Sequence, residues 1–281
     1  MLGVTEKKEI FNFFTTLVEK LSGISYGKGK EYLIESRLNE LAISLGYKDI
    51  KELYNVCRRR ADLKLLNEIV DALTTNETYF FRDRHPFEAL KSHIFPELFK
   101  KREKEKRIDI WSAACSTGQE PYSIAMLLLE HFSTYLRSYN VFIYATDISK
   151  KSIERAKQGL YHQIEINRGL PANYLVKYFK QEGSYWRIDE KVRRMVKFEV
   201  LNLLEADLKV RQKFDIIMCR YVLIYFNLDT KKKVFTKVWN RLKPGGYLFL
   251  GATEVPPVTL PDMEKKTIGR TICYYKKDQA S

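Results

Sequence analysis

A run of small residues between an apolar segment and an apolar helix is the first feature of this sequence that could bind a ligand. RIDIW (107–111) has the length and composition of a buried strand. It leads into SAACSTGQEPYSIAMLLLE (112–130), where small residues precede a helix with proline near its start. Dinucleotide-binding proteins place G-x-G-x-x-G at such a turn, but that pattern is absent here. The backbone can therefore approach a ligand that lacks pyrophosphate, and S-adenosylmethionine, with a methionine tail and no phosphate, fits that description.

Two carboxylates could contact such a ligand. Asp147 follows NVFIYAT (140–146), so it would lie at the carboxyl end of a strand, where open α/β sheets bind ligands. It could accept hydrogen bonds from both ribose hydroxyls, or it could cap the next helix with Ser149 nearby. Glu120 could merely favour a helix N-terminus through the helix dipole, or it could bind the ligand's cationic amino group or ribose. Its position within the small-residue loop favours the second role.

Hydrophobic periodicity predicts the elements that would position these groups. Residues 1–75 contain four amphipathic helical segments, the first starting near Glu6, the second following Gly29, and the last two starting near Asp49 and Asp62. After residue 107, short apolar segments alternate with helical ones, which is typical of a doubly wound α/β sheet.

The domain boundaries follow from this change in pattern. We predict a helical N-terminal domain over residues 1–75, a linker and connecting helix over 76–107, and an α/β domain over 108–281. Residues 159–201 interrupt the alternation and contain a plausible hairpin at GSYW (183–186), so we expect a small inserted β-subdomain there. The charged run KKREKEKR (100–107) is expected to be a solvated helix end.

Composition narrows the function classes. The chain has 281 residues, 45% hydrophobic and 30% charged, which is ordinary for a globular protein. It has no apolar stretch of about 18 residues and no signal-peptide pattern, so we expect a cytoplasmic location without membrane insertion. Its four cysteines and four histidines show no disulfide or metal-ligand spacing, so we expect free thiols and no metal site.

The net charge of +14 is unevenly distributed along the chain. Residues 1–75 hold 12 Lys and Arg against 11 Asp and Glu, so nearly all of the excess falls on the larger domain. Such a charge favours an acidic partner, either a nucleic acid or an anionic protein surface.

Six blocks of the sequence resemble those of the chemotaxis receptor methyltransferases. They are LTTNETYFFRD (73–83), IWSAACSTGQEPYSIAMLL (110–128), ATDIS (145–149), NLL (202–204), FDIIMCRYVLIYF (214–226) and LKPGGYLFLGATE (242–254). The resemblance covers nearly the whole chain. It implies an all-α N-terminal domain followed by a Rossmann-like S-adenosylmethionine-dependent methyltransferase domain of about seven strands, with a small inserted β-subdomain. It also implies transfer of the cofactor's methyl group to glutamate carboxylates of chemotaxis receptors, which forms methyl esters.

The same resemblance assigns site residues. The positions matching the family's cofactor contacts are Asn76, Thr78, Arg82, Glu120, Asp147, Asn202, Leu203, Arg220 and Tyr221. Arg82 and Tyr225 match the positions nearest the reaction, so they are the candidate catalytic residues. The family usually has asparagine where this sequence has Tyr221. A contact of the asparagine side chain is therefore not expected here, although a backbone contact could survive.

The implied chemistry needs no strong base, because a glutamate carboxyl group with a pKa near ~4.3 is already ionised at neutral pH. We expect Arg82 to hold the acceptor's second oxygen and Tyr225 to orient it through its hydroxyl. One alternative is a nucleic-acid methyltransferase, although an N-P-P-Y motif and stacking aromatics are missing. A second is a non-catalytic cofactor-binding regulator, against which the joint presence of Arg82, Glu120, Asp147 and Tyr225 argues.

The expected partner is the cytoplasmic helical domain of chemotaxis receptors, with no nucleic acid. The cluster Arg58-Arg59-Arg60 could form a second contact with an acidic receptor surface. Some family members bind a C-terminal receptor peptide at the β-subdomain. We do not expect that tether here, since the segment from Phe179 to Asn202 contains a single glycine, Gly183, in a turn that looks short.

Overall fold

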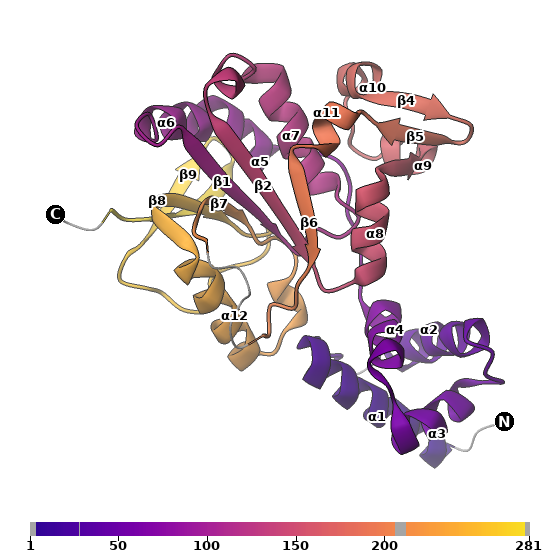
Figure 1. Ribbon diagram of the computed structural model, residues 1–281. Helices are drawn as coiled ribbons and strands as arrows, with labels where there is room; N and C mark the ends of the chain where they lie inside the picture. Colours follow the sequence, from indigo (N-terminus) through magenta and orange to yellow (C-terminus); the bar gives the residue numbers. More distant parts are fainter. Residues whose placement is uncertain (1–3, 28, 206–211, 279–281) are drawn as a thin grey trace.

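The computed structural model describes residues 4–27, 29–205 and 212–278. A small helical unit and a larger α/β unit are visible in Figure 1, with the helical unit beside one end of the sheet. None of the helices among the described residues is long and apolar enough to span a membrane.

The helical unit contains the four predicted helices, α1 (Val4–Ser22), α2 (Glu31–Ser44), α3 (Ile50–Arg60) and α4 (Leu63–Leu73). Asp49 and Asp62 begin the last two, because their carboxylates accept the backbone N–H groups of Glu52 and Leu65 at 2.9 and 2.7 Å. The apolar face of each helix packs into one separate core. The local sequence signals for this unit are confirmed.

Within the described residues, seven strands form the main sheet, in the order β6-β2-β1-β7-β8-β10-β9. They are β1 (Arg107–Ala113), β2 (Asn140–Asp147), β6 (Val196–Val200), β7 (Phe214–Met218), β8 (Leu242–Phe249), β9 (Met263–Ile268) and β10 (Thr271–Lys276). The first five are parallel, whereas β10 runs antiparallel to both β8 and β9. The chain order reverses between β1 and β7, which is the point where open α/β sheets bind ligands.

Helices cover both faces of this sheet. On one face lie α5 (His85–Ala89), the π-helical turn Leu90–Ile94, α6 (Phe95–Lys101), α7 (Gln119–His131) and α8 (Lys150–Gln158), and their apolar side chains share one core. On the other face α12 (Leu228–Asn240) packs Phe235 and Trp239 near Trp111 of β1. Side chains alternate along the strands, so β1 and β2 contribute to both cores.

The inserted subdomain has its own three-stranded sheet, in the order β3-β5-β4. It is built from β3 (Leu160–His162), α9 (Gln163–Asn167), α10 (Ala172–Tyr178), β4 (Phe179–Glu182) and β5 (Tyr185–Ile188), and α11 (Glu190–Arg193) returns to the main sheet. The predicted hairpin is confirmed, with Glu182 paired to Tyr185.

The insertion is shorter than the predicted range 159–201. Its sheet ends at Ile188, and Val196–Val200 pairs with β2 as an edge strand of the main sheet. That strand belongs to the main fold because Phe198 is buried against Tyr122 of α7, with ring centroids 5.3 Å apart.

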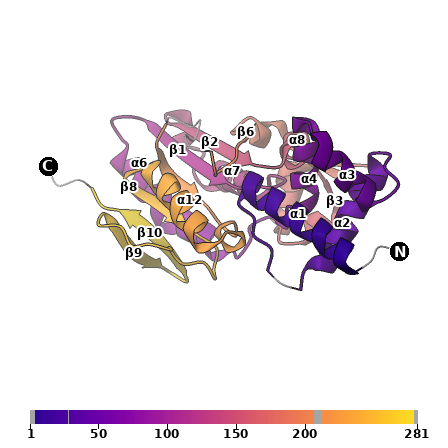
Figure 2. The same ribbon diagram turned by 90° about the horizontal axis from the view of Figure 1, so that it is seen from below.

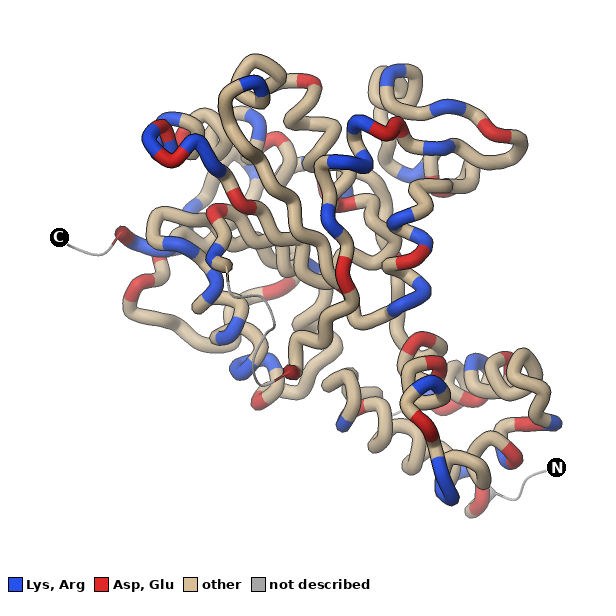
Figure 3. The backbone as a smooth tube through the Cα atoms, viewed as in Figure 1, with Lys and Arg blue, Asp and Glu red and all other residues tan. Residues whose placement is uncertain are grey.

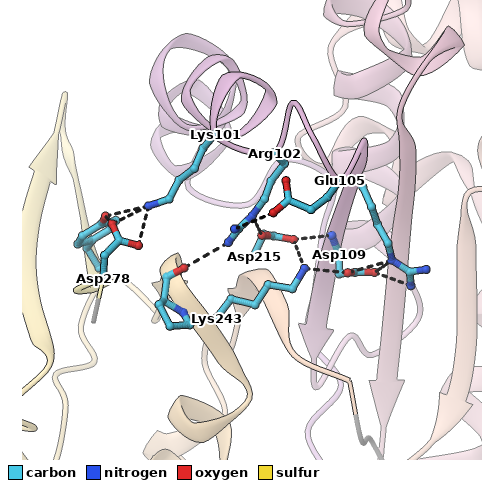
Figure 4. Close-up of polar contacts among 10 residues, drawn as sticks. Lys101, Arg102, Glu105, Asp109, Asp215, Lys243 and Asp278 are labelled. Atoms are coloured by element: carbon cyan, nitrogen blue, oxygen red, sulfur yellow. Dashed lines mark hydrogen bonds and ion pairs between the residues drawn. The ribbon is translucent and has the colours of Figure 1, made fainter. Parts of the chain in front are cut away.

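A buried ion-pair network joins the amino ends of the strands (Figure 4). Asp215 is fully buried and accepts hydrogen bonds from Arg102 Nε and Lys243 Nζ, both at 2.7 Å, and from the Asp109 backbone N–H at 2.8 Å. A Cβ on Gly246 would lie 2.9 Å from the Asp215 carbonyl oxygen. The LKPGG block, which starts β8, therefore packs closely against β7 at the amino end of the strands. Arg102, in the run expected to be solvated, is a member of this network.

The carboxyl ends of the strands face the helical unit. Figures 1 and 2 show the end of α1 beside the start of α12, where Asn227 donates to Glu19 over 2.9 Å. The Ser25 N–H donates to the Tyr225 carbonyl oxygen at 2.8 Å, and Asn202 Nδ2 donates to the Leu21 carbonyl oxygen at 2.7 Å. The two units therefore meet around the edge of the sheet where a ligand is expected.

Candidate cofactor and acceptor site

A cavity lies at this edge, between the strand ends and the helical unit. All of the predicted site residues line it: Asn76, Thr78, Arg82, Glu120, Asp147, Asn202, Leu203, Arg220, Tyr221 and Tyr225. Ser22, Ile24 and Thr74 from the helical unit also line it, which the sequence did not predict. The cavity thus has walls from both units.

The small-residue loop after β1 forms part of the cavity wall. Ala114 and Ser116 adopt positive φ angles of 65° and 50°, in the left-handed region that side chains disfavour. A Cβ on Gly118 would lie 3.0 Å from the Ala156 Cβ. Ser116 Oγ donates to the Asn76 carbonyl oxygen at 2.8 Å and ties the loop to segment 74–78. Small residues are needed here both for the backbone turn and for close packing.

Asp147 lies at the carboxyl end of β2 and lines the cavity, as predicted. Its carboxylate accepts the backbone N–H groups of Ser116 at 2.8 Å and Ser149 at 2.9 Å. The helix cap is Ser149, whose hydroxyl oxygen accepts the Ser152 N–H at 3.0 Å. Burial raises the pKa of Asp147, and the backbone hydrogen bonds oppose that rise. Each carboxylate oxygen can accept a further hydrogen bond, so Asp147 can still bind a diol.

Glu120 and Arg220 form a buried pair beside the loop. Arg220 Nη1 donates to Glu120 Oε2 at 2.8 Å, and Ser112 Oγ donates to Glu120 Oε1 at 2.7 Å. Arg220 Nη2 also donates to the Asp83 carboxylate. Burial opposes ionisation of Arg220, but the Glu120 and Asp83 carboxylates outweigh it and raise the Arg220 pKa. Glu120 does lie in the first turn of α7, yet its main partner is a guanidinium.

The loop after β7 is held by a residue to which the sequence assigned no role. Glu254 is 8% exposed, and its carboxylate accepts the backbone N–H groups of Tyr221 at 2.6 Å, Gly251 at 2.7 Å and Ile224 at 3.1 Å. The matching block LKPGGYLFLGATE ends at this residue and contains Gly251, but Tyr221 and Ile224 lie 33 and 30 positions earlier, and no local pattern indicates them. Glu254 therefore fixes the backbone that carries Tyr221 and Tyr225.

The two candidate catalytic residues come from different segments, Arg82 from the linker and Tyr225 from the loop after β7. Arg82 Nη1 donates to the Glu77 carbonyl oxygen at 2.8 Å, and its guanidinium carbon is 3.7 Å from the centre of the Tyr221 ring. Tyr225 ends the 3-10 turn Leu223–Tyr225, and its side chain is half-buried. Both side chains line the cavity.

The remaining predicted residues have different surroundings. Leu203 is 7% exposed and forms an apolar wall. Asn202 Nδ2 donates to the Leu21 carbonyl oxygen, and Asn202 Oδ1 accepts the Leu204 N–H at 2.9 Å. Its side chain therefore links the two units as well as lining the cavity. Asn76 and Thr78 lie in the segment between α4 and α5 that borders the opening.

This cavity can hold a cation that carries a ribose. It combines an acidic strand end, a carboxylate in a loop of small residues and an apolar wall, without a glycine-rich phosphate turn. Together with the strand order, these features define a Rossmann-like methyltransferase that binds S-adenosylmethionine.

Comparison with known proteins gives the family. Residues 76–272 match the family described as "CheR methyltransferase, SAM binding domain", and residues 9–74 match "CheR methyltransferase, all-alpha domain". The chain therefore belongs to the CheR methyltransferase family and is an S-adenosylmethionine-dependent methyltransferase.

Curated relatives agree over most of their length. The "Chemotaxis protein methyltransferase 1" of Pseudomonas aeruginosa is 43% identical over 248 residues, covering 87% of this chain and 89% of that protein. The "Chemotaxis protein methyltransferase Cher2" of Pseudomonas putida is 42% identical, covering 87% and 89%. The "Chemotaxis protein methyltransferase" of Borreliella burgdorferi is 35% identical, covering 90% of each chain.

Proposed function

We propose that this protein transfers the methyl group of S-adenosylmethionine to glutamate side chains of chemotaxis receptors in the cytoplasm, forming methyl esters. The observation that carries the proposal is the placement of Arg82 and Tyr225 on the same cavity as Asp147 and Glu120. A guanidinium and a phenol suit an acceptor that is already an anion, because no proton has to be removed from it.

The proposed roles follow from the contacts. Asp147 accepts the ribose hydroxyls, and Glu120, held by Arg220, lies near the methionine amino group. Asn76, Thr78, Asn202 and Leu203 contact the rest of the cofactor, and Tyr221 contributes through its backbone. When bound, S-adenosylmethionine supplies an electrophilic methyl group next to the positive sulfur.

The acceptor side depends on two residues. Arg82 donates hydrogen bonds to the carboxylate oxygen that is not methylated, and the Tyr225 hydroxyl orients the other oxygen. Alignment of the acceptor and exclusion of water from the cavity lower the barrier, since both reactants are charged.

Receptor docking is proposed to be electrostatic. Figure 3 shows basic residues near the end of α6, along α8 and around α11 of the larger unit. Arg58, Arg59 and Arg60 form the exposed last turn of α3 in the helical unit. An acidic helical surface of a receptor would complement both, and association should weaken as salt rises.

We propose that no C-terminal receptor peptide is required as a tether. The strands β4 and β5 are joined at Glu182 and Tyr185 by a turn of two residues, Gly183 and Ser184. So short a turn offers little chain to enclose an added peptide strand.

The test is incubation with labelled S-adenosylmethionine and receptor cytoplasmic fragments, followed by base treatment that releases ester-linked methyl groups as methanol. Volatile label from the receptor fragment is expected, with less transfer at higher ionic strength. Cofactor binding without methyl transfer would favour a non-catalytic regulator. Base-stable label on nucleic acid would favour a nucleic-acid methyltransferase.

A receptor fragment without its C-terminus addresses the tether. Equal transfer to the full and the truncated fragment is expected. Loss of transfer to the truncated fragment, together with peptide binding at the β4–β5 hairpin, would contradict the absence of a tether.

A further inference from the structure

We infer that Tyr221 is a positioning residue for the acceptor side of the reaction, because its ring fixes the guanidinium of Arg82. The inference rests on the proposed function of Arg82 as the group that binds the acceptor carboxylate. It assigns Tyr221 a role different from the cofactor contact that its sequence position implied.

The geometry is that of a stacked cation. The Arg82 guanidinium carbon lies 3.7 Å from the centre of the Tyr221 ring and 5.5 Å from the centre of the Tyr79 ring. A guanidinium over an aromatic face is attracted to the ring and keeps its N–H groups at its edges. Of the three guanidinium nitrogens of Arg82, only Nη1 has a hydrogen-bond acceptor among the described residues, the Glu77 carbonyl oxygen. The other N–H groups therefore remain available to a carboxylate.

The Tyr221 ring is itself held in place. Its hydroxyl donates to Asp83 Oδ2 at 2.5 Å, and the same carboxylate oxygen accepts from Arg220 Nη2. Arg220 pairs in turn with Glu120. A continuous set of contacts thus connects the guanidinium on the acceptor side with the carboxylate on the cofactor side.

The strained backbone of Tyr221 indicates a functional role for its side chain. Its φ angle is 57°, in the left-handed region that asparagine tolerates and an aromatic residue disfavours. Asparagine would relieve that strain. A strained residue whose side chain stacks on a candidate catalytic group is a reasonable functional position.

Three variants separate the possible roles. Tyr221→Phe keeps the ring and removes the hydroxyl. Tyr221→Asn removes the ring and its hydrogen bond to Asp83, and asparagine tolerates the same backbone conformation. Arg82→Ala, alone and combined with Tyr221→Asn, completes a double-mutant cycle.

The expected results follow from action through Arg82. Tyr221→Asn should lower kcat/KM for the receptor fragment by roughly 3- to 30-fold, as expected for loss of a cation–π contact. The dissociation constant of S-adenosylhomocysteine, measured by calorimetry, should change less than about twofold, a difference of no more than ~0.4 kcal/mol. Tyr221→Phe keeps the stacked ring but loses its hydrogen bond to Asp83, so it should lower kcat/KM less than Tyr221→Asn does. In the Arg82→Ala background, Tyr221→Asn should have no further effect.

Each contrary result overturns the inference. A parallel loss of cofactor affinity would make Tyr221 a cofactor contact, and additive losses in the cycle would mean that it acts independently of Arg82. Full activity of Tyr221→Asn would remove the role altogether. If the parent enzyme transfers no methyl groups to receptors, the proposed function fails instead.

A measurement without substrate tests the stacking of Arg82 on Tyr221 separately from the proposed function. The side-chain N–H resonance of Arg82, assigned with Arg82→Lys, should be shifted by the Tyr221 ring current. The shift should persist in Tyr221→Phe and vanish in Tyr221→Asn. An Arg82 resonance that is the same in all three proteins would refute the stacking.

Discussion

Replacing Glu254 by glutamine tests whether one buried carboxylate holds the loop that carries Tyr221 and Tyr225. Glu254 accepts three backbone N–H groups, those of Tyr221, Gly251 and Ile224, at 2.6, 2.7 and 3.1 Å. Glutamine has nearly the same shape but only one acceptor oxygen and no charge. If that oxygen serves Tyr221 and Gly251, the amide NH₂ faces the Ile224 N–H, and that hydrogen bond is lost.

The expected loss of stability follows from the three hydrogen bonds that Glu254 accepts. Loss of charge weakens the two remaining hydrogen bonds by about 1 kcal/mol each, and loss of the third costs about 1 kcal/mol, since a charged acceptor roughly doubles the strength of a bond. Glu254→Gln should therefore lower the free energy of unfolding by about 3 kcal/mol. The displaced loop should also reduce methyl transfer at temperatures where the protein remains folded.

Urea unfolding followed by tryptophan fluorescence, with methyl transfer measured in parallel, is the assay. Glu264→Gln in β9 is the matched control, because it removes the same charge from an exposed side chain. It should leave both stability and rate unchanged. A Glu254→Gln protein with the parent's unfolding midpoint and the parent's activity would refute the role of the carboxylate.

Four further predictions concern three residues. Asp147→Ala should weaken S-adenosylhomocysteine binding by at least about tenfold in calorimetry, because two charge-assisted hydrogen bonds are lost; unchanged affinity would remove Asp147 from the site. Because burial raises the Asp147 pKa, cofactor affinity should fall as the pH drops through a value above the ordinary aspartate range, since only the ionised group accepts both hydroxyls. Arg82→Ala should reduce turnover far more than unfolding free energy, since the side chain is partly exposed and lines the cavity; equal losses would make Arg82 structural. Asp215→Asn should cost roughly 3 kcal/mol of stability, because Arg102 loses its buried carboxylate partner and Lys243 keeps only that of Asp109. Cofactor affinity of the folded protein should stay the same, and an unchanged urea midpoint would contradict this prediction.

The sequence determined much of the fold through local signals. Helical periodicity, together with Asp49 and Asp62 as helix caps, defined the helical unit, because both effects act between residues within one or two turns. The small-residue loop and Asp147 identified the binding edge, because the carboxyl ends of parallel strands meet at one side of a sheet.

Tertiary structure alone decided which partners these residues have. Arg102 lies in a charged run expected to be solvated, yet it reaches Asp215, 113 positions away. Asn202 contacts Leu21 across 181 positions and joins the two units. Strand register and packing bring such residues together, and neither is encoded in nearby sequence. The small-residue loop, Asp147 and the family resemblance therefore predicted where the site lies. The role of Glu254, the stacking of Arg82 on Tyr221 and the place of Val196–Val200 in the main sheet depended on contacts that form only when the whole chain is folded.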